Sequence, residues 1–581
     1  MTARDRMLEQ LRLLYGDNSE AVAASLHERI DHFRRAHPQA IRPVELTERD
    51  ALLITYGDTV RAPNEAPLHT LERFIHTQLG DLITGVHILP FYPWSSDDGF
   101  SVIDYRAVDP ALGAWADVRH LAQDYLLMFD AVINHASAQS AWFQAYLRDE
   151  PPYRDYFLAA DTTWDLHAVA RPRTLPLLTP FETAAGTRLA WTTFSADQID
   201  LNYANPALLV EIADLLLFYV AQGARLIRLD AIAYLWKQSG TACIHLPQTH
   251  AVIKLLRALL DEVAPGVLLI TETNVPHAAN VSYFGAPLPA AEAPLPGRTD
   301  EAQLVYQFPL APLILHTFGA GSAAALGRWV RDLEAPGPFF NFIASHDGIG
   351  VMPALGLLRA EEIAALAART LAHGGRISYR NNPDGTQSPY ELNITLYDAL
   401  NDPAHPDLDT DVARFLAAQA IMLALAGLPG VYVHSLIGAR NCDVCVEATG
   451  RARSINREKF DLGELEQQLA DPNQRMRLVL DGYRRLLRVR RAQPAFHPNV
   501  PQCVLATPPA VFALLRQPVT DAPVLCVVNV TATSVTLPLL IDMGLPAGGW
   551  RDLLHGHTYA DFTGETPLHL EPYQTLWLTP A

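Results

Sequence analysis

From residue 50 onward, short apolar runs alternate with longer amphipathic stretches, and this alternation most constrains the fold. Short apolar runs bounded by turn residues predict buried strands, and the stretches between them predict helices. Regular strand and helix units are typical of a parallel sheet. The predicted strands are Leu52–Tyr56, Val86–Phe91, Leu126–Val132, Ala224–Asp230, Val267–Glu272, Leu304–Gln307, Phe340–His346 and Gly430–Val433. Eight such units predict an α/β fold, a closed (β/α)8 TIM barrel.

The rest of the chain departs from this alternation. Residues 1–49 carry leucines near helical spacing and predict an N-terminal helical extension. Within the predicted barrel, residues 50–495, the stretches at about 138–200 and 348–400 are too long for simple loops and predict inserted subdomains. Residues 496–581 turn to strand-like runs separated by Pro and Gly, which predict a small C-terminal antiparallel β-sandwich domain.

Composition excludes several classes of protein. The 44 Lys and Arg against 63 Asp and Glu give a net charge of −19, which excludes a nonspecific nucleic-acid binder. The apolar stretch Phe415–Val433 is interrupted by Gln419, Gly427 and Pro429, so we predict a buried helix, a turn and a strand, and no membrane span. The charged N-terminus has no apolar run after it, so we expect no signal peptide and a cytoplasmic location.

The five cysteines are few and odd in number. They argue against a disulfide framework and for a reducing compartment. The Cys442-x-x-Cys445 spacing is compatible with zinc or redox chemistry, but the sequence has no second pair to complete a zinc site. We therefore expect two free loop thiols there, and no bound metal.

Charged residues end several of the predicted strands, and the carboxyl ends of barrel strands surround the active site. Arg228 and Asp230 stand two apart, so both side chains point to the same face. The arginine would lower the pKa of Asp230 and keep it ionised, as a nucleophile requires. Glu272 ends the next strand, where partial burial would raise its pKa and suit a general acid. A structural ion pair and a helix N-terminal charge are the alternatives for these two sites.

Two further clusters follow strands. His346-Asp347-Gly348 gives a third acidic group, for which a capped turn is the alternative. Asp130-Ala-Val-Ile-Asn134-His135 places a polar cluster after another apolar run. Retaining glycosyl transfer needs two carboxyl groups about 5–5.5 Å apart, which a barrel mouth can provide. Each cluster is a weak signal, and their order along the chain is a strong one.

The ordered motifs Asp-x-x-x-Asn-His, Arg-x-Asp, strand-end Glu and His-Asp resemble those of the α-amylase superfamily of retaining α-glucoside enzymes, over about residues 52–457. The resemblance implies Asp230 as the nucleophile and Glu272 as the acid/base. It implies Asp347 as the carboxylate that stabilises the oxocarbenium-like transition state. The residues that it implies to bind glucose hydroxyls and tune Asp230 are His135, His346 and Arg228.

Finer motifs resemble the sucrose phosphorylase subfamily. They are His87-Ile-Leu-Pro90-Phe-Tyr, Asp97-Asp-Gly-Phe100, Arg171-Pro-Arg173 and Arg453-Ser-Ile-Asn-Arg457. This resemblance implies that Asp97 and Phe100 close the glucose pocket. It also implies that Arg173 helps to hold phosphate and that Arg453 lies in the glucose subsite.

The loop predicted to handle the acceptor departs from the sucrose phosphorylases. They carry Asp-Leu-Tyr-Gln where this chain has Ser388-Pro-Tyr390-Glu391, preceded by Arg380-Asn-Asn-Pro-Asp-Gly, and the stretch looks most similar to the glucosylglycerate phosphorylases. Phosphate and a glycerate carboxylate both require cations, preferably forked arginines. The candidates are Arg173, Arg376 and Arg380, and a solvated loop arginine is the alternative for the last two.

The resemblance implies a retaining glucosyl phosphorylase. It would act by double displacement, in the reversible phosphorolysis of 2-O-α-D-glucosylglycerate to α-D-glucose 1-phosphate and D-glycerate. Inorganic phosphate would be the co-substrate, with no cofactor. The alternatives are a sucrose, sucrose 6′-phosphate or glucosylglycerol phosphorylase, and a hydrolase or transglucosidase on the same barrel. A non-catalytic barrel is disfavoured because all three carboxylates are present. We expect a small-molecule glucoside and phosphate as partners, with no nucleic acid and no membrane, and the sequence leaves open whether the chain forms a homodimer.

Overall fold

The structure is a computed structural model that describes all residues except 40, 42, 162, 296, 383–385, 538–547 and 560–566. Its centre is a closed barrel in which strands that follow one another in the chain are neighbours, and β18 closes on β1. The parallel strands are β1 (Leu52–Thr55), β3 (Gly85–Ile88), β6 (Leu126–Ala131), β11 (Ala224–Leu229), β12 (Leu268–Thr271), β13 (Leu304–Tyr306), β14 (Phe339–Asn341) and β18 (Leu428–Tyr432). The predictions of an α/β barrel and an antiparallel C-terminal domain are confirmed.

One predicted run differs from the strand that forms. The run Phe340–His346 predicts a long strand, but β14 ends at Asn341. Phe342, Ile343 and Ala344 remain buried beyond the paired part of the sheet, which explains why the apolar run overestimates the strand. This segment carries His346 and Asp347 beyond the end of the barrel strand.

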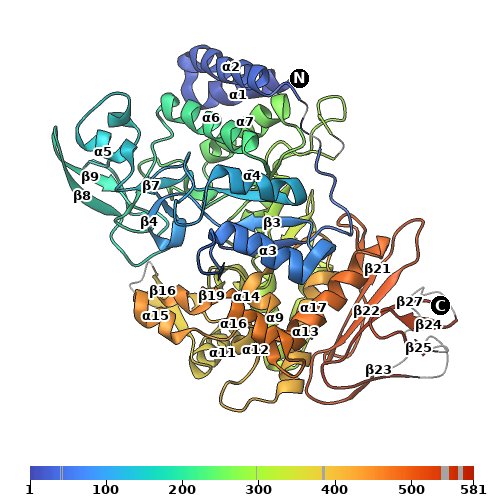
Figure 1. The fold of residues 1–581 in the computed structure, drawn as a ribbon. Helices are drawn as coiled ribbons and strands as arrows, with labels where there is room; N and C mark the ends of the chain where they lie inside the picture. The colour runs from blue at the N-terminus through green and yellow to red at the C-terminus, as the bar shows by residue number, and fades with distance from the viewer. Residues whose placement is uncertain are drawn as a thin grey trace.

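Helices surround the barrel (Figure 1). Those that follow the successive strands are α3 (Pro67–Leu79), α4 (Trp115–Asp124), α6 (Pro206–Ala221), α7 (Pro247–Val263), α8 (His277–Val281), α9 (Leu310–Ala320), α13 (Leu408–Ala424) and α17 (Arg475–Arg490). Shorter helices are α10 (Ala324–Arg331), α14 (Val433–Leu436) and α16 (Leu462–Ala470). Pro67, Pro206 and Pro247 each begin a helix at a position where a missing backbone N–H has no cost.

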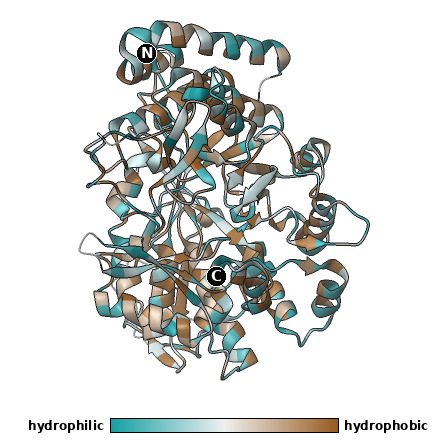
Figure 2. Ribbon diagram, turned by 90° about the vertical axis from the view of Figure 1, so that its left-hand side faces the viewer, coloured by the Kyte–Doolittle hydropathy of each residue, from teal (hydrophilic) through white to brown (hydrophobic). Residues whose placement is uncertain are grey.

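The N-terminal residues form two helices that pack on α6 and α7, at the blue end of the ribbon in Figure 1. They are α1 (Ala3–Tyr15) and α2 (Ser19–Ala36). Buried Arg6 donates to Asp261 at 2.9 Å, so a desolvated ion pair joins α1 to α7. In Figure 2 these helices carry both hydropathy colours, as expected when only one face of a helix is buried.

Two insertions rise at the carboxyl side of the barrel strands. The first contains α5 (Ala141–Leu147), the hairpin of β8 (Leu178–Thr183) with β9 (Gly186–Trp191), and the pair of β7 (His135–Ser137) with β10 (Gln198–Asp200). The second contains a sheet of β15 (Ile349–Gly350), β17 (Gln387–Asn393) and β16 (Arg376–Asn381), with α11 (Ala360–Ala372) and α12 (Leu396–Leu400). Short pairs are β4 (Trp94–Ser96) with β5 (Ser101–Val102), and β2 (Val60–Arg61) with β19 (Phe460–Asp461).

The described C-terminal residues form a six-stranded antiparallel sheet and a two-stranded pair. The sheet contains β20 (Gln502–Val504), β21 (Val511–Arg516), β22 (Val524–Asn529), β27 (Thr575–Pro580), β24 (Trp550–Asp552) and β25 (Thr558–Tyr559), and the pair is β23 (Val535–Leu537) with β26 (Leu568–Leu570). Phe512 and Leu514 join the main core, whereas Val511 and Ala513 join a second core with the pair. Burial of both sheet faces explains why these strands are continuously apolar. The exact domain boundaries drawn from the sequence stay predictions.

Candidate active site

A pocket of about 570 Å³ opens at the carboxyl ends of the barrel strands. All but three of the residues given a site role from the sequence line it, and the three exceptions are Arg228, Arg376 and Arg380. The predicted residues on its wall are Asp230, Glu272, Asp347, Asp97, Phe100, His135, His346, Arg453, Arg173, Tyr390 and Glu391. The barrel thus brings together side chains separated by more than 300 positions in the sequence.

Asp230 and Glu272 follow directly after β11 and β12, which are adjacent strands. Arg228, one residue before the end of β11, lies beneath them and is 1% exposed. Its Nη1 donates to Asp230 at 2.8 Å, while its Nη2 lies 3.9 Å from Glu272. Glu272 instead accepts the backbone N–H of Ala231 at 2.9 Å, and Ala231 has a φ of 48°, in the left-handed region. The buried guanidinium of Arg228 therefore contacts Asp230 closely and Glu272 only at a longer distance.

Burial raises the pKa of Asp230 to about 7, against the opposing effect of Arg228. Burial likewise raises the pKa of Glu272 to about 7, and the charge of Asp230 adds to the rise while Arg228 opposes it. Interacting carboxyls of this kind share a proton near neutral pH. Because Arg228 contacts Asp230 more closely, the charge lies on Asp230 and the proton on Glu272. Arg228 lowers the pKa of Asp230, as predicted, but burial outweighs the ion pair, so the pKa lies above its ordinary value.

Arg228 also has a second carboxylate partner. Its Nη1 donates to Asp130, which in turn contacts His87 Nε2 at 2.7 Å. Burial would raise the pKa of Asp130, but His87 and Arg228 lower it to about 2. The guanidinium also lies between the rings of Phe100 and Tyr306, 5.7 and 5.2 Å from their centres. These contacts fix Arg228 in one orientation.

The third carboxylate belongs to a different network. Asp347 lies 2.6 Å from Arg453 Nη1 and 3.4 Å from His346 Nε2. Burial would raise the pKa of Asp347, but Arg453, His346 and Arg457 together hold it below its usual range. Asp347 is therefore ionised across the neutral range, as a carboxylate that stabilises developing positive charge must be.

Arg453 connects Asp347 to the acceptor loop. Its Nε and Nη2 donate to the two carboxylate oxygens of Glu391 at 3.0 and 2.7 Å, a forked pair. Arg173 lies 4.0 Å from the same carboxylate, and its guanidinium sits 5.5 Å from the centre of the Tyr390 ring. Arg173, Arg453, Tyr390 and Glu391 therefore form one polar wall of the pocket.

Phe100 and His346 form another part of the lining. Their rings stack at 4.8 Å with planes 4° apart. His135 Nε2 lies 2.8 Å from the Phe100 carbonyl oxygen, and Gln198 Nε2 donates to the same oxygen at 3.0 Å. Burial lowers the pKa of His135, so it is a neutral donor here. The predicted glucose contacts of Phe100, His135 and His346 stay predictions, and the geometry places all three on the pocket.

A strained turn presents Asp97 to the pocket. Asp97 and Asp98 have φ values of 56° and 49°, and Gly99 has a φ of 107°. A Cβ on Gly99 would lie 2.5 Å from the Pro90 carbonyl oxygen, so only glycine fits. Left-handed conformations at non-glycine residues cost free energy and often occur at functional sites.

The other candidate arginines lie elsewhere. Arg376 Nη2 extends to Asp443 at 3.0 Å, and Arg380 Nε donates to Ser388 at 3.2 Å. Their assignment as anion ligands is therefore not supported by the pocket lining. Pro383, Asp384 and Gly385, in the predicted acceptor stretch, lie outside the described residues.

Sequence reasoning assigned no role to several residues that the site uses. Arg457 donates from Nε to the His346 carbonyl at 2.8 Å and from Nη1 to Asp98 at 2.5 Å, and so joins the strained turn to the strand end. Gln198, Asn274, Phe194 and Phe308 also line the pocket. Arg457 and Asn274 belong to motifs identified in the sequence, whereas Gln198 follows no apolar strand of the barrel and gave no signal.

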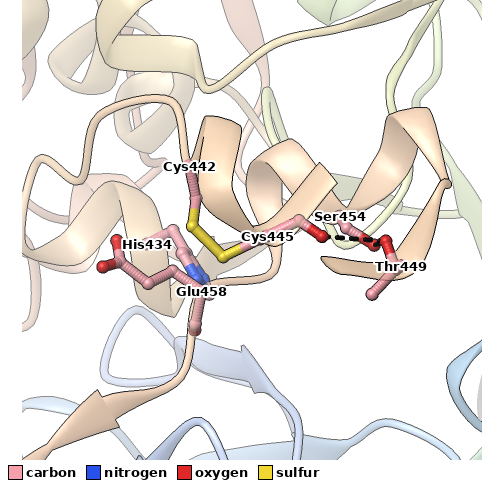
Figure 3. The surroundings of a disulfide bond; sticks show 6 residues. All are labelled: His434, Cys442, Cys445, Thr449, Ser454 and Glu458. Carbon is pink, nitrogen blue, oxygen red and sulfur yellow. Dashed lines mark hydrogen bonds between the residues drawn. A yellow bond between two sulfur atoms is a disulfide. The ribbon is translucent and has the colours of Figure 1, made fainter. Parts of the chain in front are cut away.

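The expectation of free thiols at Cys442 and Cys445 is wrong, because the two form a disulfide (Figure 3). Cys442 is the residue before α15 (Asp443–Thr449), and Cys445 is its third residue. The first turn of a helix brings residues three apart onto the same side, which explains the pairing. The described part of the chain contains no helix long and apolar enough to cross a membrane.

Comparisons with known proteins agree with this geometry. The family model described as the alpha amylase catalytic domain matches residues 77–309. Glucosylglycerate phosphorylase of Allomeiothermus silvanus is 49% identical over 99% of this chain and 98% of its own length. Glucosylglycerate phosphorylase of Escherichia coli is 44% identical over 85% of this chain and 87% of its own. Sucrose phosphorylase of Agrobacterium vitis is 32% identical over 77% of this chain and 88% of its own.

The fold also matches solved structures. The crystal structure of sucrose 6F-phosphate phosphorylase from Thermoanaerobacter thermosaccharolyticum superposes with a TM-score of 0.73, covering 89% of this chain and 99% of that one at 24% identity. At this identity the match supports the fold, and the relatives of higher identity support the family. The chain belongs to the α-amylase family, among its glycoside phosphorylases.

Proposed function

We propose that this chain catalyses the reversible phosphorolysis of 2-O-α-D-glucosylglycerate to α-D-glucose 1-phosphate and D-glycerate, with retention of configuration. The observation that carries the catalytic part is the unequal contact of Arg228 with Asp230 and Glu272, which separates a charged carboxylate from a protonated one. The substrate rests on two relatives named glucosylglycerate phosphorylase that are 49% and 47% identical over 99% of this chain.

In the first step, Glu272 gives its proton to the glycosidic oxygen while Asp230 attacks C1 of glucose. Glycerate leaves, and a β-glucosyl ester forms on Asp230. Asp347 stays charged beside the reacting centre and stabilises the positive charge that develops on the sugar ring. The raised pKa of Glu272, about 7, keeps a large fraction of this group protonated at neutral pH and able to act as the acid.

In the second step, phosphate occupies the place from which glycerate departed. Glu272, now ionised, accepts a phosphate proton as the phosphate oxygen attacks C1 and frees Asp230. Two inversions give the α-anomer of glucose 1-phosphate. Arg173 would favour phosphate over water as the attacking group. It lies on the pocket wall, and its contact with Glu391 is long, at 4.0 Å, so its guanidinium can bind an anion.

A cytoplasmic location fits this chemistry. The product is a charged sugar phosphate, which does not cross a membrane unaided because an ionised group is costly to desolvate. The glucose 1-phosphate therefore remains in the compartment in which the enzyme makes it.

Synthesis in the reverse direction tests the acceptor. The enzyme is incubated with α-D-glucose 1-phosphate and either D-glycerate, fructose, fructose 6-phosphate or glycerol, and phosphate release is measured. We expect the fastest release with D-glycerate, and none with any acceptor for Asp230→Asn. Preference for fructose or glycerol would refute the glycerate assignment, and rapid release without an acceptor would indicate a hydrolase.

A further inference from the structure

The Cys442–Cys445 disulfide lies at the start of α15. The 3₁₀ segment Ala452–Asn456 follows α15 and carries Arg453 into the pocket. Figure 3 shows the disulfide at one end of α15 and the contact of Thr449 with Ser454 at the other. The disulfide and the pocket arginine are thus parts of one short stretch of chain.

The disulfide joins residues that the backbone already holds together. The N–H groups of Cys445 and Val446 both donate to the Cys442 carbonyl, at 3.2 and 3.3 Å. The stabilisation that a disulfide gives by restricting the unfolded chain decreases as the closed loop becomes shorter, and this loop is among the shortest. The disulfide therefore adds little to the free energy of unfolding of the whole protein.

The disulfide has a larger effect on the local stability of α15 than on the stability of the whole protein. α15 has seven residues, each at least partly exposed, and a helix this short is unstable without external contacts. The disulfide fixes its first turn. Reduction would therefore loosen α15 without opening the protein core.

Two hydrogen bonds join α15 and the residue before it to the residues that follow Arg453. The Cys442 N–H donates to the Ile455 carbonyl at 3.0 Å, and Thr449 Oγ1 donates to Ser454 Oγ at 2.7 Å. Both acceptors belong to the 3₁₀ segment, directly after Arg453. The segment that carries Arg453, with its forked contact to Glu391, is thus hydrogen-bonded to α15 and to the residue before it.

We propose that the Cys442–Cys445 disulfide is a reversible modification site, reduced by a dithiol, whose state determines how firmly Arg453 is held in the pocket. Cys445 is the more exposed partner, so a thiolate of the reductant attacks its sulfur. The S–S bond breaks, and Cys442 leaves as a thiolate and takes up a proton. The second thiolate of the reductant then attacks the mixed disulfide and releases Cys445. Two electrons and two protons pass to the protein, and the dithiol becomes a disulfide.

The test compares oxidised and dithiothreitol-reduced protein, with alkylation and mass spectrometry to show which thiols have formed. Cys503 is exposed and free, so it is labelled in both states, whereas Cys445 is labelled only after reduction. The inference rests on the proposed function, so the readout is the KM for the glucoside in glucose 1-phosphate formation. We expect reduction to raise this KM about 3- to 10-fold, the effect of losing one hydrogen bond that holds a site. Reoxidation should restore it, and Tm should change little.

Matched variants separate this effect from other thiol chemistry. The double variant Cys442→Ser with Cys445→Ser should have the raised KM and no response to dithiothreitol, while Cys503→Ser should respond like the parent protein. An unchanged KM after demonstrated reduction, or a disulfide that resists reduction until the protein unfolds, would overturn the inference. If the oxidised protein forms no glucose 1-phosphate, the proposed function fails. The two redox states are then compared by glucoside binding in calorimetry, because Arg453 lines the pocket whichever acceptor is used.

Discussion

Arg228 Nη1 lies 2.8 Å from Asp230 Oδ1, and this contact decides which of the two buried carboxyls carries the charge. The same guanidinium reaches Glu272 only at 3.9 Å. A nucleophile and an acid thus arise from two groups whose pKa values are both raised by burial.

The first prediction concerns pH. Because the pKa of Glu272 is about 7, the proton needed for leaving-group departure is lost as the pH rises through that value. We expect kcat/KM for phosphorolysis to fall on the alkaline side with a midpoint at about pH 7, as the Asp230–Glu272 pair loses its shared proton, and to fall on the acid side as the pair takes up a second proton. Glu272→Gln should lose about 10²- to 10⁴-fold in activity on the natural glucoside. Cleavage of α-glucosyl fluoride, which needs no acid, should be largely retained, and an equal loss on both substrates would contradict the assignment.

The second prediction concerns stability. The folded-state pKa of Glu272 is raised above its ordinary value, so between about pH 4 and 7 this carboxyl binds more protons in the folded protein than in the unfolded chain. Its contribution to the free energy of unfolding therefore falls as the pH rises through this window. Glu272→Gln should stabilise the protein at pH 8 relative to pH 5, by about 1–3 kcal/mol. Asp347 has the opposite shift, so Asp347→Asn should lower Tm at pH 8. Calorimetry at both pH values checks the two signs, and shifts independent of pH would count against this account.

The third prediction separates the candidate phosphate ligands. Arg173 lines the pocket, whereas Arg376 extends to Asp443. Arg173→Gln should raise the KM for phosphate about 10- to 100-fold, because a charge-assisted hydrogen bond is lost. Arg376→Gln, which removes the same charge from the surface, should leave this KM unchanged. Initial rates at varied phosphate measure both, and equal effects would exclude Arg173 as the specific ligand.

The fourth prediction concerns the strained turn. Gly99 and Gly186 have nearly equal φ values, 107° and 106°, but only at Gly99 would a Cβ meet nearby atoms. Gly99→Ala should therefore displace the turn and raise the KM for the glucoside about 5- to 160-fold, the range that corresponds to 1–3 kcal/mol of strain. Gly186→Ala has the same backbone cost in an open turn of the β8–β9 hairpin and should leave KM unchanged. Similar KM values for the two variants would show that the turn tolerates the displacement.

The sequence predicts the barrel well because each strand is buried on both faces and is therefore continuously apolar. The catalytic candidates follow from the same pattern, since Asp230 and Glu272 interrupt apolar runs at strand ends. The length of β14 could not be predicted in this way, because Phe342 is buried beyond the paired sheet and gives the same apolar signal as a strand residue.

Side-chain direction outside the barrel was harder to predict. Arg376 and Arg380 lie on β16, at the edge of an antiparallel sheet, and the sequence does not reveal which way that edge faces. Gln198 reaches the pocket through the pairing of β10 with β7, a contact across more than 60 residues. The balance between burial and ion pairing at Asp230 depends on desolvation, which no spacing of residues encodes.

The most direct test of the central claim is the rate of α-D-glucose 1-phosphate formation in the presence of phosphate, with 2-O-α-D-glucosylglycerate and sucrose compared at equal concentration. The account predicts a strong preference for the glycerate glucoside and no appreciable product without phosphate. Preference for sucrose would contradict the specificity assigned to the Ser388–Glu391 loop, and glucose release without phosphate would show a hydrolase.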